Sequence, residues 1–170
     1  MEALIIVDML NDFVRKDAPL YVPGAENTIP AIKREIERAD KQGIPVIYVC
    51  DAHDPDDEEF SIWPAHCVRG TKGAQVVDEL KPKKHHIIIE KTRYSGFFRT
   101  NLEETLRNLN VDTVRLVGVA TNICVLYTAA DAFMRGFRIL VVSDGVEGLT
   151  PEDKEWALKQ MKNLFLAEVV

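Results

Sequence analysis

The chain has few cysteines, and their number limits the chemistry open to it. Three cysteines, Cys50, Cys67 and Cys124, occur among its 170 residues. An odd number without regular spacing does not form a disulfide framework, so at least one thiol stays free even in an oxidising compartment. We therefore expect a free thiol in the folded protein.

Long apolar runs, blocks of one charge and nucleotide-binding motifs are also missing. No apolar run approaches the roughly 20 residues that cross a bilayer, and Met1-Glu2 leads straight into an apolar run without the features of a signal peptide. Twenty-seven acidic and 21 basic residues give a net charge of -6, with no basic block to follow a phosphate backbone. Gly-x-Gly-x-x-Gly and Gly-Lys-Ser/Thr motifs are absent. We expect a cytoplasmic protein that binds no membrane, nucleic acid or nucleotide cofactor.

Five short apolar runs predict a parallel sheet. They lie at 3–7, 46–49, 87–89, 114–117 and 139–142, and a weaker run follows at 165–169. Their continuous apolar character is typical of strands covered on both faces. Apolar residues at helical spacing between them predict helices over 29–39, 102–109, 125–135 and 151–161. Strands that alternate with helices indicate an α/β fold in a single domain over residues 1–170.

The segment 51–84 does not fit this alternation of strands and helices. It contains three prolines and two glycines, and only 74–80 has the pattern of a short helix. Irregular connections of this length within compact domains are usually functional. We expect this segment to contribute to a site.

Two charged residues stand at the ends of predicted strands. Asp8 follows the first strand and Lys91 ends the third. The carboxyl ends of parallel strands lie at one edge of the sheet, where the active sites of such folds occur. Each residue alone has an ordinary alternative, a helix cap for the aspartate and a solvated surface residue for the lysine.

Cys124 supplies the third member of this set. It follows the fourth strand and stands in the first turn of a helix that begins near Ile123. The positive end of that helix and a nearby ammonium would lower the thiol pKa, and unpaired N–H groups there could hold an oxyanion. A buried cysteine by itself is more often structural. Together with Asp8 and Lys91, it predicts a catalytic nucleophile.

The long segment also carries residues of the types that bind metals. Asp51 and His53 follow the second strand, and His66 comes thirteen residues later. A carboxylate and two imidazoles suit zinc, iron or manganese, and three ligands leave positions free for water or substrate. From spacing alone, His66 could equally cap or pack.

Four segments of the chain together resemble the isochorismatase-like cysteine hydrolases, and within them the nicotinamidases, over nearly the whole length. The matching segments are 7–13, 91–97, 118–125 and 131–136. The resemblance implies a three-layer α/β/α fold with a six-stranded parallel sheet of order 3-2-1-4-5-6. It also implies a catalytic triad of Asp8, Lys91 and Cys124. A cis peptide at Val119-Ala120 would turn the Ala120 N–H towards the oxyanion, beside the N–H of Cys124.

The same resemblance gives the metal site a function. It implies that Asp51, His53 and His66 hold a divalent metal, with zinc the first choice, and that this metal binds the pyridine nitrogen of the substrate. Some relatives supply a fourth ligand near the position of Glu59. The aromatic side chains expected to sandwich the substrate ring are Phe13, for which core packing is an equal alternative, and Trp63.

The expected reaction is metal-dependent hydrolysis of nicotinamide to nicotinate and ammonia through a cysteine thioester. The alternative within the superfamily is hydrolysis of a ureido acid, an N-carbamoyl acid or isochorismate, and a non-catalytic binding protein of this fold is a further alternative. Leu10 stands where many relatives have glutamine, which affects the expected pocket shape. The expected partners are a small amide and, because family members are often dimers or larger, other copies of the chain.

Overall fold

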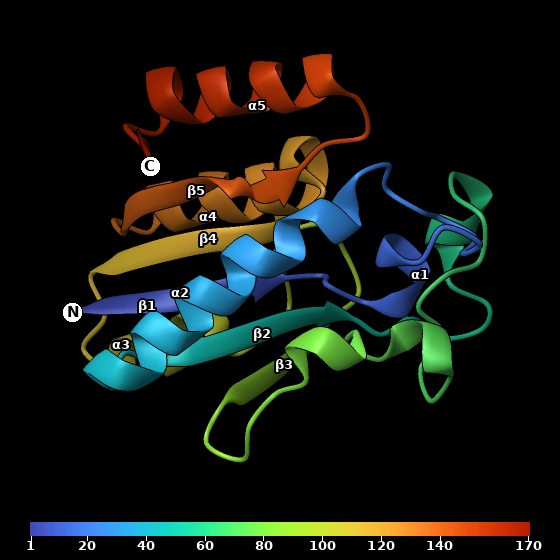
Figure 1. The fold of residues 1–170 in the computed structure, drawn as a ribbon, viewed down its shortest axis with the longest axis horizontal. Coiled ribbons are helices and arrows are strands. Elements are labelled where there is room, and N and C mark those ends of the chain that lie inside the picture. Colours follow the sequence, from blue (N-terminus) through green and yellow to red (C-terminus); the bar gives the residue numbers. More distant parts are fainter.

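A sheet of six parallel strands forms the centre of the computed structural model, which describes residues 1–170 (Figure 1). The strands are β1 (Glu2–Val7), β2 (Val46–Asp51), β3 (Ile87–Lys91), β4 (Thr113–Val119), β5 (Arg138–Glu147) and β6 (Glu168–Val169). Their order is β3-β2-β1-β4-β5-β6, and every neighbouring pair is parallel. The predicted fold class and strand order are confirmed.

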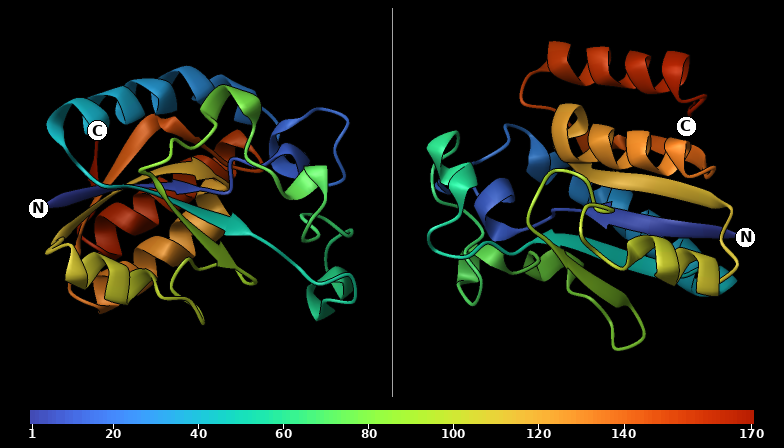
Figure 2. Two further views of the ribbon diagram at one scale, coloured as in Figure 1. Left: turned by 90° about the horizontal axis from the view of Figure 1, so that it is seen from below. Right: turned by 180° about the vertical axis from the view of Figure 1, so that it is seen from behind.

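Helices cover both faces of the sheet. The long α2 (Ile29–Gln42) lies on one face, and α3 (Leu102–Asn108), α4 (Leu126–Met134) and α5 (Pro151–Leu164) lie on the other (Figures 1 and 2). The short α1 (Asn11–Val14) contributes buried residues to the same core as α2. The start of α5 follows from its sequence, because the side chain of Thr150 accepts a hydrogen bond from the N–H of Asp153. None of the helices combines the length and apolar character needed to cross a membrane.

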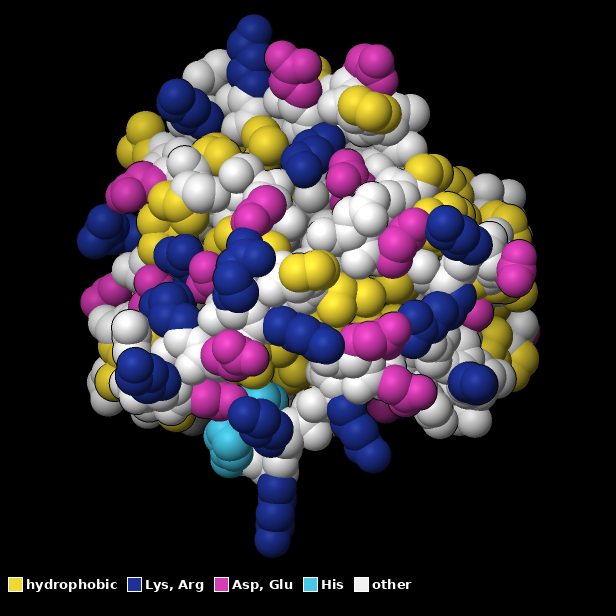
Figure 3. Space-filling view, in the orientation of Figure 1, with side chains coloured by type: hydrophobic (Ala, Val, Ile, Leu, Met, Phe, Trp, Pro, Cys, Tyr) yellow, Lys and Arg dark blue, Asp and Glu magenta, His cyan; other side chains and the backbone are white.

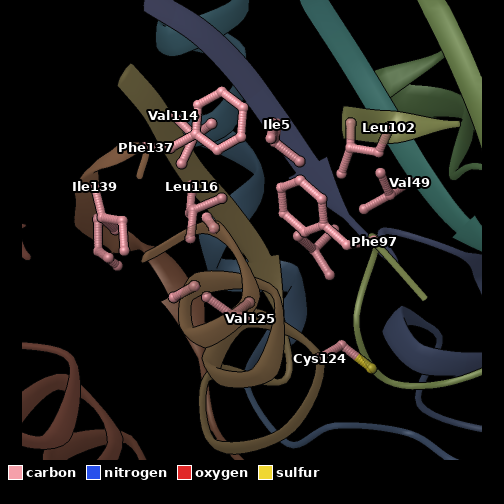
Figure 4. Close-up of a cluster of buried hydrophobic side chains, with 14 of the residues drawn as sticks. Ile5, Val49, Phe97, Leu102, Val114, Leu116, Cys124, Val125, Phe137 and Ile139 are labelled. Carbon is pink, nitrogen blue, oxygen red and sulfur yellow. The ribbon is translucent and has the colours of Figure 1, made fainter. Parts of the chain in front are cut away.

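Alternate residues of β1 enter two different cores. Ile5 and Val7 pack with α3 and α4, whereas Leu4 and Ile6 pack with α2, and all four are fully buried. This double burial explains why the strand reads as a continuous apolar run. Figure 4 shows the first core, with Cys124 at its edge and the sulfur directed away from Val125.

The long segment after β2 and α1 lie together beyond the carboxyl ends of the strands (Figures 1 and 2). The prediction of a helix over 74–80 is wrong, because the structure has separate 3₁₀ turns at Lys72–Ala74 and Asp78–Leu80. Between them the backbone pairs with the chain after β1: the Asn11 N–H donates to the Gln75 carbonyl and the Val77 N–H to that of Met9. These long-range bonds use the groups that a local helix would need.

Candidate active site

Three strand ends bring Asp8, Lys91 and Cys124 into contact. Lys91 Nζ lies 2.8 Å from Asp8 Oδ2 and 3.6 Å from Cys124 Sγ. All three residues are buried. The sheet therefore assembles the three residues that the sequence analysis placed at its carboxyl edge.

Asp8 is held so that it can accept a proton. Its Oδ1 accepts a hydrogen bond of 2.8 Å from the N–H of Asp51. Burial, and next the charge of Asp51, raise the pKa of Asp8 to about 6, although the ammonium of Lys91 opposes the shift. A carboxylate with such a pKa is ionised at neutral pH and is a stronger base than an exposed aspartate.

The pKa of the Cys124 thiol is shifted in the opposite direction to the one expected from the sequence. Burial raises the pKa of its thiol well above the usual value and outweighs the attraction of Lys91, so the thiol keeps its proton. The helix terminus and the ammonium favour the thiolate, but the desolvation of the sulfur opposes it more strongly. The residue also lies in a π-helical turn, Thr121–Val125, which precedes α4. Attack by the sulfur therefore requires a base, and Asp8 is beside it.

The turn between β4 and Cys124 presents a free backbone donor. The peptide bond between Val119 and Ala120 is cis, as the resemblance implied. The N–H of Ala120 donates to no group of the protein, and Ala120 lines the same pocket as Cys124. Such a donor beside a nucleophile can accept the negative charge of a tetrahedral intermediate.

The three predicted metal ligands converge with Glu59 in one buried cluster, Asp51, His53, Glu59 and His66. Their nearest ligand atoms lie within 4.8 Å of one another. His53 Nε2 is 3.2 Å from Glu59 Oε2 and 3.3 Å from Asp51 Oδ2, and His66 Nε2 is 3.4 Å from Glu59 Oε2. A 3₁₀ turn at Glu58–Ser61 carries Glu59 into this position, which spacing in the sequence left open.

The cluster fits a divalent metal. His53 Nδ1 donates to Asp57 Oδ2 over 3.0 Å and His66 Nδ1 donates to the Pro64 carbonyl over 2.7 Å, so in each ring Nε2 is the atom left to bind a metal, in exchange for its proton. His53 Nε2 is buried without a hydrogen-bond partner. Burial lowers the pKa of His66, but hydrogen bonds to Asp51 and Glu59 raise it to about 10. The two carboxylates thus favour positive charge at this position.

A narrow pocket connects the cluster to the cysteine. Asp51, Glu59 and His66 line one part and Cys124 another, and the apolar lining includes Phe13, Leu20, Val22, Trp63, Tyr94, Ala120, Ile123 and Leu149. Both aromatic residues expected in the pocket are there. Neither lysine nor arginine belongs to the lining.

Several lining residues were missed. Tyr94, whose hydroxyl accepts a 3.1 Å hydrogen bond from Trp63 Nε1, lies within the matched segment 91–97 and could have been noticed. Leu20, Val22 and Leu149 come from connections without a periodic pattern, so nothing in the sequence marked them.

Comparison with known proteins agrees with the fold. The isochorismatase domain pattern matches residues 2–170. The chain is 37% identical to the uncharacterized isochorismatase family protein PncA of Bacillus subtilis (strain 168), over 99% of this chain and 98% of that protein.

Two solved structures are also similar. N-carbamoylsarcosine amidase from Thermoplasma acidophilum is 40% identical with a TM-score of 0.90, over 99% of this chain and 94% of that chain. The pyrazinamidase of Pyrococcus horikoshii in complex with zinc is 38% identical with a TM-score of 0.93, over 99% of this chain and 98% of that chain. The fold is thus that of the isochorismatase-like hydrolases. The chain belongs to the isochorismatase family.

Proposed function

We propose that this hydrolase cleaves a neutral aromatic carboxamide, nicotinamide, to nicotinate and ammonia. The observation that carries the proposal is a single apolar pocket that joins Cys124 to the buried cluster of Asp51, Glu59 and His66. A flat ring suits the space beside Phe13 and Trp63. The similarity to a zinc-bound pyrazinamidase supports this choice.

Asp51, His53, Glu59 and His66 would hold the metal, for which zinc suits two imidazoles and two carboxylates. When bound, it would supply a coordination position for the ring nitrogen of the substrate. All four ligand residues are buried, so their ligand atoms are shielded from bulk water. The metal ligands thus orient the substrate, while the bond-breaking steps belong to the other end of the pocket.

The chemistry begins at Cys124. Its Sγ forms a bond to the carboxamide carbon while Asp8 takes the thiol proton, and Lys91 stabilises the negative charge on both. The N–H groups of Ala120 and Cys124 bind the oxyanion. The C–N bond then breaks as Asp8 gives the proton to the departing nitrogen, which leaves as ammonia. A thioester remains on Cys124.

Hydrolysis of the thioester uses the same base. Asp8 takes a proton from a water molecule while the water oxygen bonds to the thioester carbon. The C–S bond then breaks, and Asp8 returns that proton to the sulfur of Cys124. Nicotinic acid leaves, gives its remaining proton to water to become nicotinate, and the starting state is restored. The raised pKa of Asp8 suits a group that exchanges a proton repeatedly near neutral pH.

A substrate with its own carboxylate suits this pocket less well. An N-carbamoyl acid, a ureido acid or isochorismate would bring a negative charge into a mostly apolar pocket whose lining has neither lysine nor arginine to pair with it. A buried charge without a partner costs several kcal/mol. A neutral amide avoids this cost.

Ammonia release measured with nicotinamide, pyrazinamide and N-carbamoylsarcosine tests the proposal. We expect turnover of the two ring amides only, its loss after chelation, and no turnover in Cys124→Ala, whose metal content should match that of the parent. Cys50→Ala, at a buried cysteine outside the pocket lining, is the matched control and should keep its activity. Turnover of N-carbamoylsarcosine alone would overturn the substrate, and ammonia release by Cys124→Ala would overturn the nucleophile.

A further inference from the structure

Asp57 and Arg93 lie outside the pocket lining and yet contact both halves of the site. Asp57 Oδ2 accepts the 3.0 Å hydrogen bond from His53 Nδ1, and its Oδ1 accepts a 2.8 Å bond from the N–H of Glu59. Arg93 Nη1 lies 3.0 and 3.1 Å from the two carboxylate oxygens of Asp57. The main-chain carbonyl of Arg93 accepts a 2.9 Å bond from Lys91 Nζ. Asp57 and Arg93 therefore lie between two of the metal ligands and the strand end that carries Lys91, which also contacts the ligand Asp51 directly.

We propose that Asp57 and Arg93 are positioning residues that set the metal affinity of the cluster, an inference that rests on the metal site of the proposed function. A carboxylate that accepts from Nδ1 keeps the proton there, fixes the ring orientation and makes Nε2 a stronger ligand. Asp57 does this for His53 through its side chain. It holds Glu59 through the backbone, so it positions two of the four ligands.

Arg93 keeps Asp57 in this position. The Asp57 side chain is only 9% exposed, and among the lysines and arginines it forms an ion pair with Arg93 alone. Without the guanidinium, the carboxylate would lose its counter-charge and two of the contacts that prevent its rotation. The Arg93 side chain is 39% exposed, so its removal should cost the fold little.

A purely structural role is the competing explanation. Asp57 caps the 3₁₀ turn at Glu58–Ser61, and an arginine near the surface often forms an ion pair of little energetic value. Such roles would change the stability of the metal-free protein but not its intrinsic affinity for a metal. Metal affinity and the spectrum of the bound metal separate the two explanations.

The test uses the full chain with Cys124→Ala as the parent, so that turnover plays no part. Zn²⁺ affinity is measured by competition with a chromophoric chelator, and the ligand geometry by the visible d–d spectrum of bound Co²⁺. In Asp57→Asn the amide oxygen can still accept from the Glu59 N–H, but the charge that faces His53 is lost. We expect the dissociation constant for Zn²⁺ to rise about 10- to 100-fold, with a changed Co²⁺ spectrum.

Arg93→Ala should give a smaller rise in the same direction, and Arg93→Lys should restore part of the loss because it keeps the charge. This exposed position keeps the test decisive even if Asp57→Asn folds poorly.

Matched controls come from similar pairs elsewhere in the chain. Asp40→Asn alters a carboxylate that contacts His85 and His86, and Arg34→Ala removes an arginine paired with Asp144. Both controls should bind Zn²⁺ like the parent. Unchanged affinity and Co²⁺ spectra in the Asp57 and Arg93 variants would overturn this inference alone. A parent that binds no Zn²⁺ would overturn both it and the metal site of the proposed function.

Discussion

At the scale of single residues, Lys91 is the group that both halves of the site share. Its side chain is completely buried, and its Nζ contacts Asp8, Asp51, Cys124 Sγ and the Arg93 carbonyl. Burial opposes its charge, but the charges of Asp51 and Asp8 prevail and hold the pKa of Lys91 well above its usual value. One ammonium thus serves as the counter-charge shared by two buried carboxylates.

Replacement of this ammonium should unfold the protein more readily. Lys91→Met keeps the length of the side chain but leaves Asp8 and Asp51 close together without a counter-charge. Removal of one partner from a buried ion pair costs about 3–5 kcal/mol, and urea unfolding of the metal-free protein measures the loss. Lys81→Met, at an exposed lysine, should change the free energy of unfolding by less than about 0.5 kcal/mol. Equal midpoints for the two variants would contradict the proposed role of the ammonium.

At the scale of secondary-structure elements, the approach of β4 to β1 decides where Asp8 and the turn before Cys124 lie. Gly118 pairs with Val7 and has a φ of +113°. A Cβ at this position would be 2.0 Å from the Val7 carbonyl oxygen. Only glycine allows the two strands to approach so closely at their carboxyl ends.

A methyl group at position 118 should therefore act on both stability and catalysis. Gly118→Ala must push β4 away from Val7, so we expect a larger loss of stability than in Gly43→Ala, together with reduced ammonia release. Gly43 also has a positive φ, +68°, but nothing lies within 4 Å of the added Cβ. Its substitution should lower the free energy of unfolding only by the backbone strain of a non-glycine residue at positive φ, about 1–2 kcal/mol. Urea unfolding compares the two variants, and equal losses would show that the close approach does not matter.

At the scale of the whole molecule, a second cluster of histidines ties α2 to the amino end of β3. Asp40 Oδ1 accepts from His85 Nε2 at 2.9 Å and from His86 Nε2 at 3.0 Å, and Oδ2 accepts from Lys83 Nζ at 2.6 Å. Figure 3 shows histidine on this face among acidic and basic side chains. His86 Nδ1 accepts the N–H of Lys83, so its Nε2 carries the proton and has no lone pair for a metal. The cluster is a hydrogen-bonded link between elements.

This link should make the overall stability depend on pH. Burial opposes ionisation of Asp40, but hydrogen bonds from Lys83, His86 and His85 hold its pKa well below the usual range. Because the pKa is lower in the folded state, the link stabilises the protein above the unfolded pKa of about 4 and is lost as the pH falls further.

Urea unfolding of wild type and Asp40→Asn, both metal-free, between pH 5 and pH 2.5 measures this effect. We expect Asp40→Asn to be less stable by about 1–3 kcal/mol at pH 5, with the difference shrinking below about pH 4. A difference that does not vary with pH would contradict the ionic character of the link.

The sequence by itself determined the layers of the fold and the edge at which the polar residues collect. Strands that are buried on both faces are recognisable in the sequence as continuous apolar runs. Parallel strands place their carboxyl ends at one edge of the sheet, independently of the conformations of the loops. Asp8, Lys91 and Cys124 could therefore be brought together without knowledge of the connections between strands. The strand order and the cis peptide came from the family resemblance.

Only the tertiary structure decided how these groups behave and what surrounds them. The segment 51–84 has neither helical nor strand periodicity. The positions of Glu59 in the metal cluster and of Asp57 beside Arg93 therefore depend on hydrogen bonds within the folded chain. The protonated state of Cys124 depends on how much water the folded chain removes from the sulfur. Loss of solvent is a property of the whole packed molecule, and it outweighed the local charges that the sequence displays.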